Sequence, residues 1–118
     1  MPPKNKTVFD MDNWTTQLRK GILELCILEL ISTKQMYGYD IVKRLTGIQS
    51  LVISEGTVYP LLSRLKRANL VETHLQESTS GPARKYYLLT PLGRQALRQM
   101  KDYWKDIVSG VEELPADE

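Results

Sequence analysis

Residues that form covalent cross-links or metal sites are almost missing from this sequence, which has one cysteine and one histidine among 118 residues. An internal disulfide is therefore excluded, and we expect Cys26, which lies in an apolar run, to be a small buried hydrophobic residue. His74 has no cysteine, histidine or pair of carboxylates near it in the sequence. No metal site is predicted, because metal sites in proteins take several such ligands.

Long apolar stretches and catalytic motifs are missing too. Glu24 and Glu29 interrupt the longest apolar run, at residues 22–31, whereas a membrane-spanning helix needs about 20 largely apolar residues. No apolar segment follows Lys4 and Lys6, so we expect a cytoplasmic protein with no membrane partner. The sequence offers no nucleophile beside a base, no glycine-rich phosphate loop and no metal-ligand spacing, so we expect neither an enzyme nor a cofactor.

Acidic residues are scarce in the middle of the chain, and basic residues are scarce at its end. The net charge of +2 divides into +6 over residues 34–98, from ten basic and four acidic residues, and −4 over residues 99–118, from two basic and six acidic residues. This division favours a basic surface that binds nucleic acid and an acidic end that stays away from it. A chain of this length predicts one domain with a modest core.

Residues 54–70 carry the clearest helical pattern. The apolar residues recur at the spacing of one helix face, after Ser54 as an N-cap: Val58, Leu61, Leu62 and Leu65. The opposite face contains Gly56, Pro60, Ser63 and Arg67, flanked by Thr57, Tyr59, Arg64 and Lys66, with no acid beyond Glu55. A surface helix usually mixes both charge signs, so this face is typical of a helix that contacts a polyanion. An ordinary amphipathic helix with a solvated basic face gives the same pattern.

Two helices are predicted before this stretch, after a polar N-terminal arm at residues 1–13. The first runs from about residue 14 to residue 32 and has apolar residues on more than one side, which indicates a second subunit and assigns Leu18 and Ile22 to a dimer interface. The second covers residues 37–45, after a turn at residues 34–36. Lys43 and Arg44, on this second helix, are candidates for phosphate contacts.

A β-hairpin is predicted after the central helix. Residues 71–77 and 83–89 favour strands, and the serine, glycine and proline residues between them favour a turn. Arg84 and Lys85 are expected near the tip of this hairpin, where they would contact DNA phosphates.

A long helix is predicted at the end of the chain, because Thr90 and Pro91 supply an N-cap and a favoured first helical residue. Its apolar stripe is too long to be covered within one subunit, so we expect it to form a homodimer interface. The stripe assigned to that interface comprises Leu92, Ala96, Met100, Tyr103, Ile107 and Val111.

The predicted fold class is therefore mainly α with a small β-hairpin. Residues 14–90 are expected to form a winged helix-turn-helix domain, and residues 91–118 a C-terminal dimerisation helix with an acidic tail. In such a domain the third helix enters the major groove of double-stranded DNA and the wing contacts the flanking backbone. Arg64 and Arg67 can bond guanine bidentately, although each serves equally well as a phosphate contact or a free surface charge.

Three segments of the sequence resemble the PadR family of bacterial transcriptional regulators: residues 37–41, 55–65 and 84–93, in the family's order and spacing. The short C-terminal part is similar to the compact branch of the family, with a single dimerisation helix. The resemblance implies a homodimeric repressor that binds a pseudo-palindromic operator and is released by a small molecule or a stress signal. It also implies that Gly56, Thr57, Tyr59 and Pro60 face the operator, with Tyr37 anchoring the second helix nearby.

The role of Trp104 stays open between two interpretations. The resemblance implies that a tryptophan here stacks on a small aromatic effector in a cavity between subunits, whereas the simpler interpretation places Trp104 in the dimer core. Two other functions remain as alternatives to a repressor: a winged-helix module that binds protein and no DNA, and a sensor that chiefly binds aromatic drugs.

Overall fold

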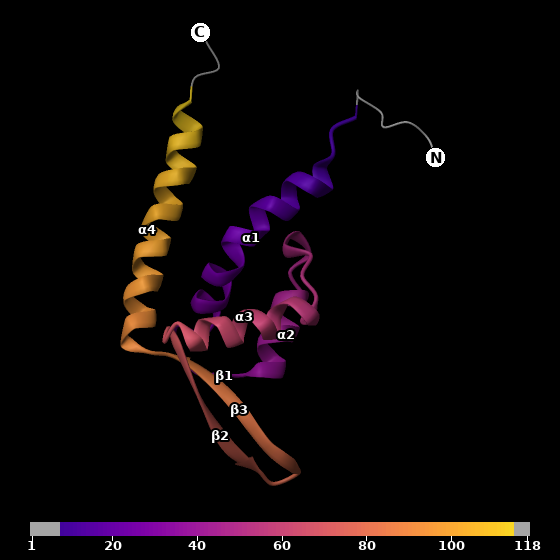
Figure 1. Ribbon diagram of the computed structural model, residues 1–118, viewed down its shortest axis with the longest axis vertical. Helices are drawn as coiled ribbons and strands as arrows, with labels where there is room; N and C mark the ends of the chain where they lie inside the picture. Colours follow the sequence, from indigo (N-terminus) through magenta and orange to yellow (C-terminus); the bar gives the residue numbers. More distant parts are fainter. Residues whose placement is uncertain (1–7, 115–118) are drawn as a thin grey trace.

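Four α-helices, one short 3-10 helix and a small antiparallel sheet make up the described part of the chain (Figure 1). The computed structural model describes residues 8–114, so part of the predicted arm (1–7) and the end of the predicted acidic tail (115–118) lie outside it. The elements, in chain order, are α1 (Met11–Leu30), β1 (Met36–Tyr37), α2 (Gly38–Thr46), the short 3-10 helix η1 (Gln49–Leu51), α3 (Glu55–Arg67), β2 (Val71–Ser78), β3 (Gly81–Leu89) and α4 (Pro91–Glu113). This arrangement confirms the predicted fold class, a mainly α winged helix-turn-helix with a long C-terminal helix.

Helix α1 begins earlier than predicted, at Met11 in place of residue 14. The cause is local, because the carboxylate of Asp10 accepts a hydrogen bond of 3.0 Å from the backbone N–H of Asn13 and so caps the first turn. Asp12 adds a second negative charge near the positive end of the helix dipole. The last residues of the predicted arm are therefore helical.

The sheet has three strands, in the order β1-β3-β2, where the sequence predicted only a hairpin. Met36 pairs with Tyr87 and Tyr37 pairs with Tyr86, so part of the predicted turn at residues 34–36 is a strand. Two residues are too few to show the alternation that marks a strand in a sequence. The added strand covers one edge of β3 and ties the wing to the start of α2.

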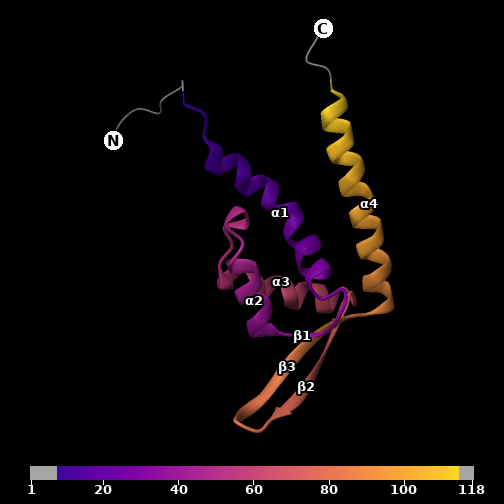
Figure 2. The ribbon, with the colours of Figure 1, turned by 180° about the vertical axis from the view of Figure 1, so that it is seen from behind.

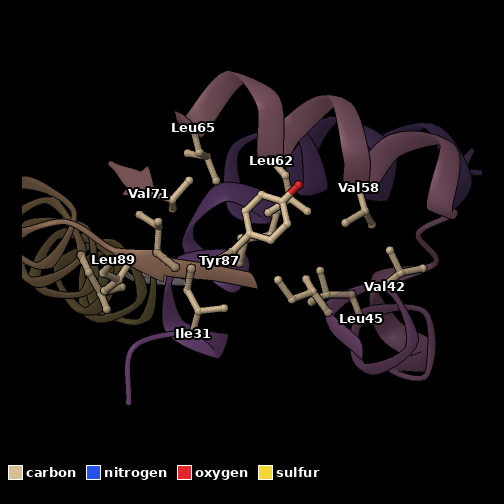
Figure 3. Close-up of a cluster of buried hydrophobic side chains, with 13 residues drawn as sticks. Ile31, Val42, Leu45, Val58, Leu62, Leu65, Val71, Tyr87 and Leu89 are labelled. Carbon is tan, nitrogen blue, oxygen red and sulfur yellow. The ribbon is translucent and has the colours of Figure 1, made fainter. Parts of the chain in front are cut away.

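The core lies between α1, α2, α3 and the base of the sheet (Figure 3). Helix α3 contributes Val58, Leu62 and Leu65, which are almost completely buried, as its apolar stripe predicted. Cys26 packs against this core but is only partly buried, where the sequence predicted a buried residue, and its partial burial raises the pKa of its thiol. The apolar face of α3 is thus buried within one subunit, so the opposite face of the helix points outward.

The junction between the wing and α4 is held by Thr90. Its hydroxyl donates to the carbonyl of Asn69 at 2.7 Å and accepts from the backbone N–H of Gly93 at 2.9 Å, which caps α4 as predicted. A Cβ atom at Gly93 would lie 2.0 Å from the carbonyl oxygen of Leu70, so only glycine fits there. These contacts set the direction in which α4 leaves the body of the domain.

Helices α1 and α4 meet at the body and diverge toward the ends of the chain, as Figures 1 and 2 show. An ion pair of 3.2 Å between Lys101 and Glu29 joins them where they begin to separate. Beyond it, every described residue of α4 is exposed. No helix within residues 8–114 is both long and apolar enough to cross a membrane.

Candidate nucleic-acid interface

The apolar face of α3 packs against the core, and the opposite, outward face is exposed to solvent. Its exposed residues are Gly56, Thr57, Tyr59, Pro60, Ser63 and Arg67. Pro60 lies inside the helix and has no N–H, so the carbonyl of Gly56 lacks its usual helical donor and stays free to accept a hydrogen bond. The face therefore presents hydroxyl groups, a free carbonyl and a guanidinium group, which are the groups that bond to base edges and phosphates.

A basic hollow of about 420 Å³ lies between α3 and the wing. It is lined by Leu62, Ser63, Lys66, Arg67, Lys85 and Tyr87. Three of these residues are cationic, two carry hydroxyl groups and none is acidic, so the hollow matches the charge and hydrogen-bonding needs of a phosphate group. We name it the wing hollow.

The structure brings Lys85 of β3 together with Ser63 and Arg67 of α3 in the wing hollow, although Lys85 is far from them in the sequence. Lys66 joins them and was missing from the predicted DNA-binding residues. The sequence did carry a signal for it, because Lys66 flanks the acid-free face and precedes Arg67. Its place beside Lys85 depends on how the wing packs, which no local pattern shows.

Tyr59 lies where α2 and α3 approach each other. A Cβ atom at Gly38 would be 3.5 Å from the ring of Tyr59, which is ordinary contact, and 3.2 Å from the ring of Tyr87, so a larger residue at position 38 would crowd Tyr87 of β3. Burial raises the pKa of the Tyr59 hydroxyl, and the negative charge of Glu55 raises it further. Tyr59 is therefore protonated at neutral pH, and its hydroxyl can donate a hydrogen bond to a phosphate oxygen.

Arg84 lies toward the tip of the wing, as predicted, in the last regular strand pair before the turn, and its side chain reaches back to the aromatic ring of Tyr37. It pairs with Gln76 across the hairpin, and its guanidinium carbon is 4.9 Å from the centre of the Tyr37 ring. The Tyr37 ring lies 5.9 Å from that of Tyr86. Tyr37 thus anchors the start of α2 to the wing through aromatic and cation–π contacts.

Arg64 points toward α1, where its guanidinium group forms an ion pair with Glu24. The pair leaves the Arg64 side chain half exposed, but a base contact would require it to break. Arg67 forms no ion pair with another described residue and lies in the wing hollow. Of the two arginines considered for reading guanine, Arg67 has the more favourable position.

Lys43 and Arg44 line a different hollow, between α1 and α2. That hollow also contains Glu29 and Asp40, so its charge is mixed, and no residue of α3 or the wing lines it. The ammonium group of Lys43 lies 5.6 Å from the centre of the Tyr39 ring. The structure does not bring these two cations into the surface formed by α3 and the wing.

The apolar residues assigned to a dimer interface fall into two groups. Exposed ones are Leu18, Leu92, Tyr103, Ile107 and Val111, whereas Ile22, Ala96 and Met100 are partly buried. Met100 packs against the core of its own subunit, so part of the predicted stripe is used within the chain. Trp104, at 40% exposure, lies within the exposed part of α4. Several large apolar residues near the start of the chain are also exposed and were not predicted for the interface: Val8, Phe9, Met11 and Trp14.

Comparisons with known proteins identify the relatives of this chain. The sequence profile of the transcriptional regulator PadR-like family matches residues 27–99. The structure of a PadR-like transcriptional regulator from Bacillus cereus is similar, with a TM-score of 0.76 and 39% identity over 86% of this chain and 99% of that one. A PadR family regulator from Eggerthella lenta gives a TM-score of 0.78 and 30% identity over 91% and 93% of the two chains. Transcriptional regulator Rv3488 of Mycobacterium tuberculosis is 28% identical over 98 residues, which cover 80% of this chain and 90% of that protein.

Proposed function

Because this chain belongs to the PadR-like family of transcriptional regulators, which are not enzymes, we propose that it is a homodimeric repressor that binds a pseudo-palindromic operator in the cytoplasm. The observation that carries the proposal is the outward face of α3. That face has no apolar patch and no acidic residue beyond Glu55, and it adjoins the three cations of the wing hollow.

In the proposed complex, α3 enters the major groove and the wing hollow holds a backbone phosphate. Gly56, Thr57, Tyr59 and Pro60 face the DNA at the start of the helix, and Arg67 lies where it can bond guanine bidentately. Lys66 and Lys85 neutralise the phosphate from opposite sides of the hollow. Arg64, Lys43 and Arg44 have no place in this proposal, because the first is paired with Glu24 and the others line the hollow beside α1.

A second copy of the chain accounts for the exposed apolar residues of α1 and α4. Ile107, Val108 and Val111 are exposed on a helix that extends beyond the body of the domain, where the subunit itself provides no cover. Burying them against a partner would recover roughly 25 cal/mol for each Å² of apolar surface removed from water. A symmetric dimer also presents α3 twice, as two half-sites about 34 Å apart require.

Release of the operator by a small aromatic molecule or a stress signal is a further part of the proposal. Trp104 lies among the exposed apolar residues of α4, so its ring would be at or beside the joint between subunits. A planar ligand that stacks there in only one arrangement of the two subunits would shift the spacing of the two α3 helices.

A protein-interaction module without DNA binding is the competing function. Such a module presents apolar anchors at its contact surface, whereas α3 presents glycine, hydroxyl and basic residues. Retention of a protein partner in high salt, with no retention of DNA in low salt, would establish the competing function.

Selection of bound fragments from genomic DNA, followed by titration of the recovered site, tests the proposal. Arg67→Ala is expected to weaken operator binding by about 1–3 kcal/mol and, if Arg67 reads guanine, to relax the preference at one base pair of each half-site. Arg98→Ala, which removes an exposed arginine of α4, is the matched control and should leave the affinity unchanged. Wild-type protein that retains no DNA at low salt would contradict the proposal.

A further inference from the structure

A second basic hollow, of about 230 Å³, lies on the other flank of α3, where the first turn of the helix meets α1. It is lined by Thr16, Arg19, Lys20, Leu23, Val52, Ile53 and Thr57. Two of these residues are cationic, two carry hydroxyl groups and none is acidic. We name it the α1 hollow. Its cations belong to a helix that the sequence pattern assigned to core and dimer contacts alone.

The α1 hollow continues the surface proposed to face DNA, because Thr57 belongs to both. The side chain of Arg19 is held in place by a hydrogen bond of 3.2 Å from its guanidinium group to the hydroxyl of Thr16, and Lys20 is exposed. Glu24, one turn further along α1, is already paired with Arg64. The two cations of the hollow therefore keep their positive charge available for an anion.

The rim of the α1 hollow includes a strained residue. Val52 has φ 44° and ψ 56°, in the left-handed region, and is 69% exposed. A β-branched residue rarely adopts this conformation, and such strain collects at sites where the chain must follow a particular path. Here the chain that connects α2 and α3 passes beside α1 (Figures 1 and 2). Val52 and Ile53 of this connection line the hollow together with residues of α1 and the first turn of α3.

We propose that the α1 hollow binds a phosphate of the operator backbone, with Arg19 and Lys20 as the anion ligands. The inference rests on the proposed DNA-binding function and adds a contact to it. The wing and the diverging ends of α1 and α4 lie at opposite ends of the domain (Figure 1). In a dimer joined through those ends, the wing hollow holds a phosphate at the outer flank of each half-site. The α1 hollow holds one nearer the centre of the operator.

Neutral phosphate substitutions test this placement. Operators are prepared with a single methylphosphonate at each backbone position in turn, and their affinities are measured for the wild type, the double variant Arg19→Gln with Lys20→Gln, Lys20→Gln alone, and Lys85→Gln. Each lost phosphate contact should weaken specific and non-specific DNA alike and make the slope of log affinity against log salt shallower by about 1. Methylphosphonate at one central phosphate should weaken the wild type but have no further effect on the double variant.

For Lys85→Gln, the methylphosphonate that has no further effect should lie at an outer phosphate. For Arg98→Gln, every methylphosphonate should weaken binding as it does in the wild type. An unchanged affinity and salt slope for both α1 variants, beside a weakened Lys85→Gln, would overturn the inference and leave the proposed function standing. The inference would also be overturned if the methylphosphonate without further effect on the α1 variants lay at an outer phosphate. If the wild type binds no DNA, the proposed function itself fails. Because Lys20 is exposed, Lys20→Gln keeps the test valid even if loss of the partly buried Arg19 unfolds the chain.

Discussion

The outward face of α3 and the distal half of α4 are both exposed, but they differ in their apolar content. The face of α3 carries mainly glycine, serine, threonine and arginine, whereas the distal half of α4 combines charged residues with exposed tyrosine, tryptophan and large aliphatic side chains. The first surface is complementary to a polyanion, whereas the second leaves a stripe of large apolar side chains in water. We therefore interpret the exposure of α3 as a surface for the proposed DNA contact, and the exposure of the apolar stripe of α4 as a surface for the proposed second subunit.

The largest expected effect comes from placing a charge on each surface in turn. Ile107→Asp would bury two carboxylates in a symmetric dimer, each without a partner, at about 3–5 kcal/mol apiece. We expect the dimer to dissociate and the operator to be released, with the mass measured by light scattering falling to that of one 13.6 kDa chain.

Ser63→Asp is the matched substitution on α3. It should leave the dimer mass unchanged and weaken DNA binding, because the carboxylate enters the wing hollow where a phosphate is proposed to sit. A monomeric Ser63→Asp protein, or a dimeric Ile107→Asp protein that still binds the operator, would mean that the two surfaces have been assigned the wrong partners.

A smaller effect is expected from the side chains that hold the face of α3 outward. Leu62 is completely buried beneath that face, so Leu62→Ala should lower the free energy of unfolding by about 2–5 kcal/mol through lost burial and a residual cavity. Leu75→Ala on the wing, at 69% exposure, is the same substitution at an open position and should stay within about 0.5 kcal/mol of the wild type. Urea unfolding followed by circular dichroism measures both, and equal losses would contradict the described burial of α3.

The smallest effect concerns pH. Burial raises the pKa of the Tyr87 hydroxyl, and the charge of Tyr59 raises it further, so the folded chain holds this proton more tightly than the unfolded chain does. The resulting stabilisation is fully present below about pH 10, the ordinary value for tyrosine, and is lost as the pH rises through the folded pKa. Tyr87→Phe should make the free energy of unfolding less dependent on pH above that value.

Local patterns predicted most of the fold. The apolar stripe of α3 and the capping pair Thr90 and Pro91 placed two helices correctly, because both signals are complete within a few residues. Strand β1 was missed because its two residues are defined only by pairing with β3. The pair of Arg64 with Glu24 was missed for the same kind of reason, since its partners are 40 positions apart.

The candidate site was predicted in part. Most of the residues proposed to face the operator were visible as an acid-free helix face, and the structure shows that this face is exposed. The two hollows that flank it were not visible, because Lys66 meets Lys85 only through the packing of the wing, and Arg19 and Lys20 meet Thr57 only through the packing of α1. Which cations surround a helix depends on tertiary contacts that periodicity does not contain.

One measurement tests most directly whether α3 faces the duplex from both subunits. Ser63→Cys in a Cys26→Ser background carries a single thiol, on the outward face of α3, to which a DNA-cleaving iron chelate is attached. Bound to the selected operator, it should cut the DNA at two places related by symmetry and about one helical turn, roughly 34 Å, apart. Cleavage at no defined position, or at one place only, would contradict the account.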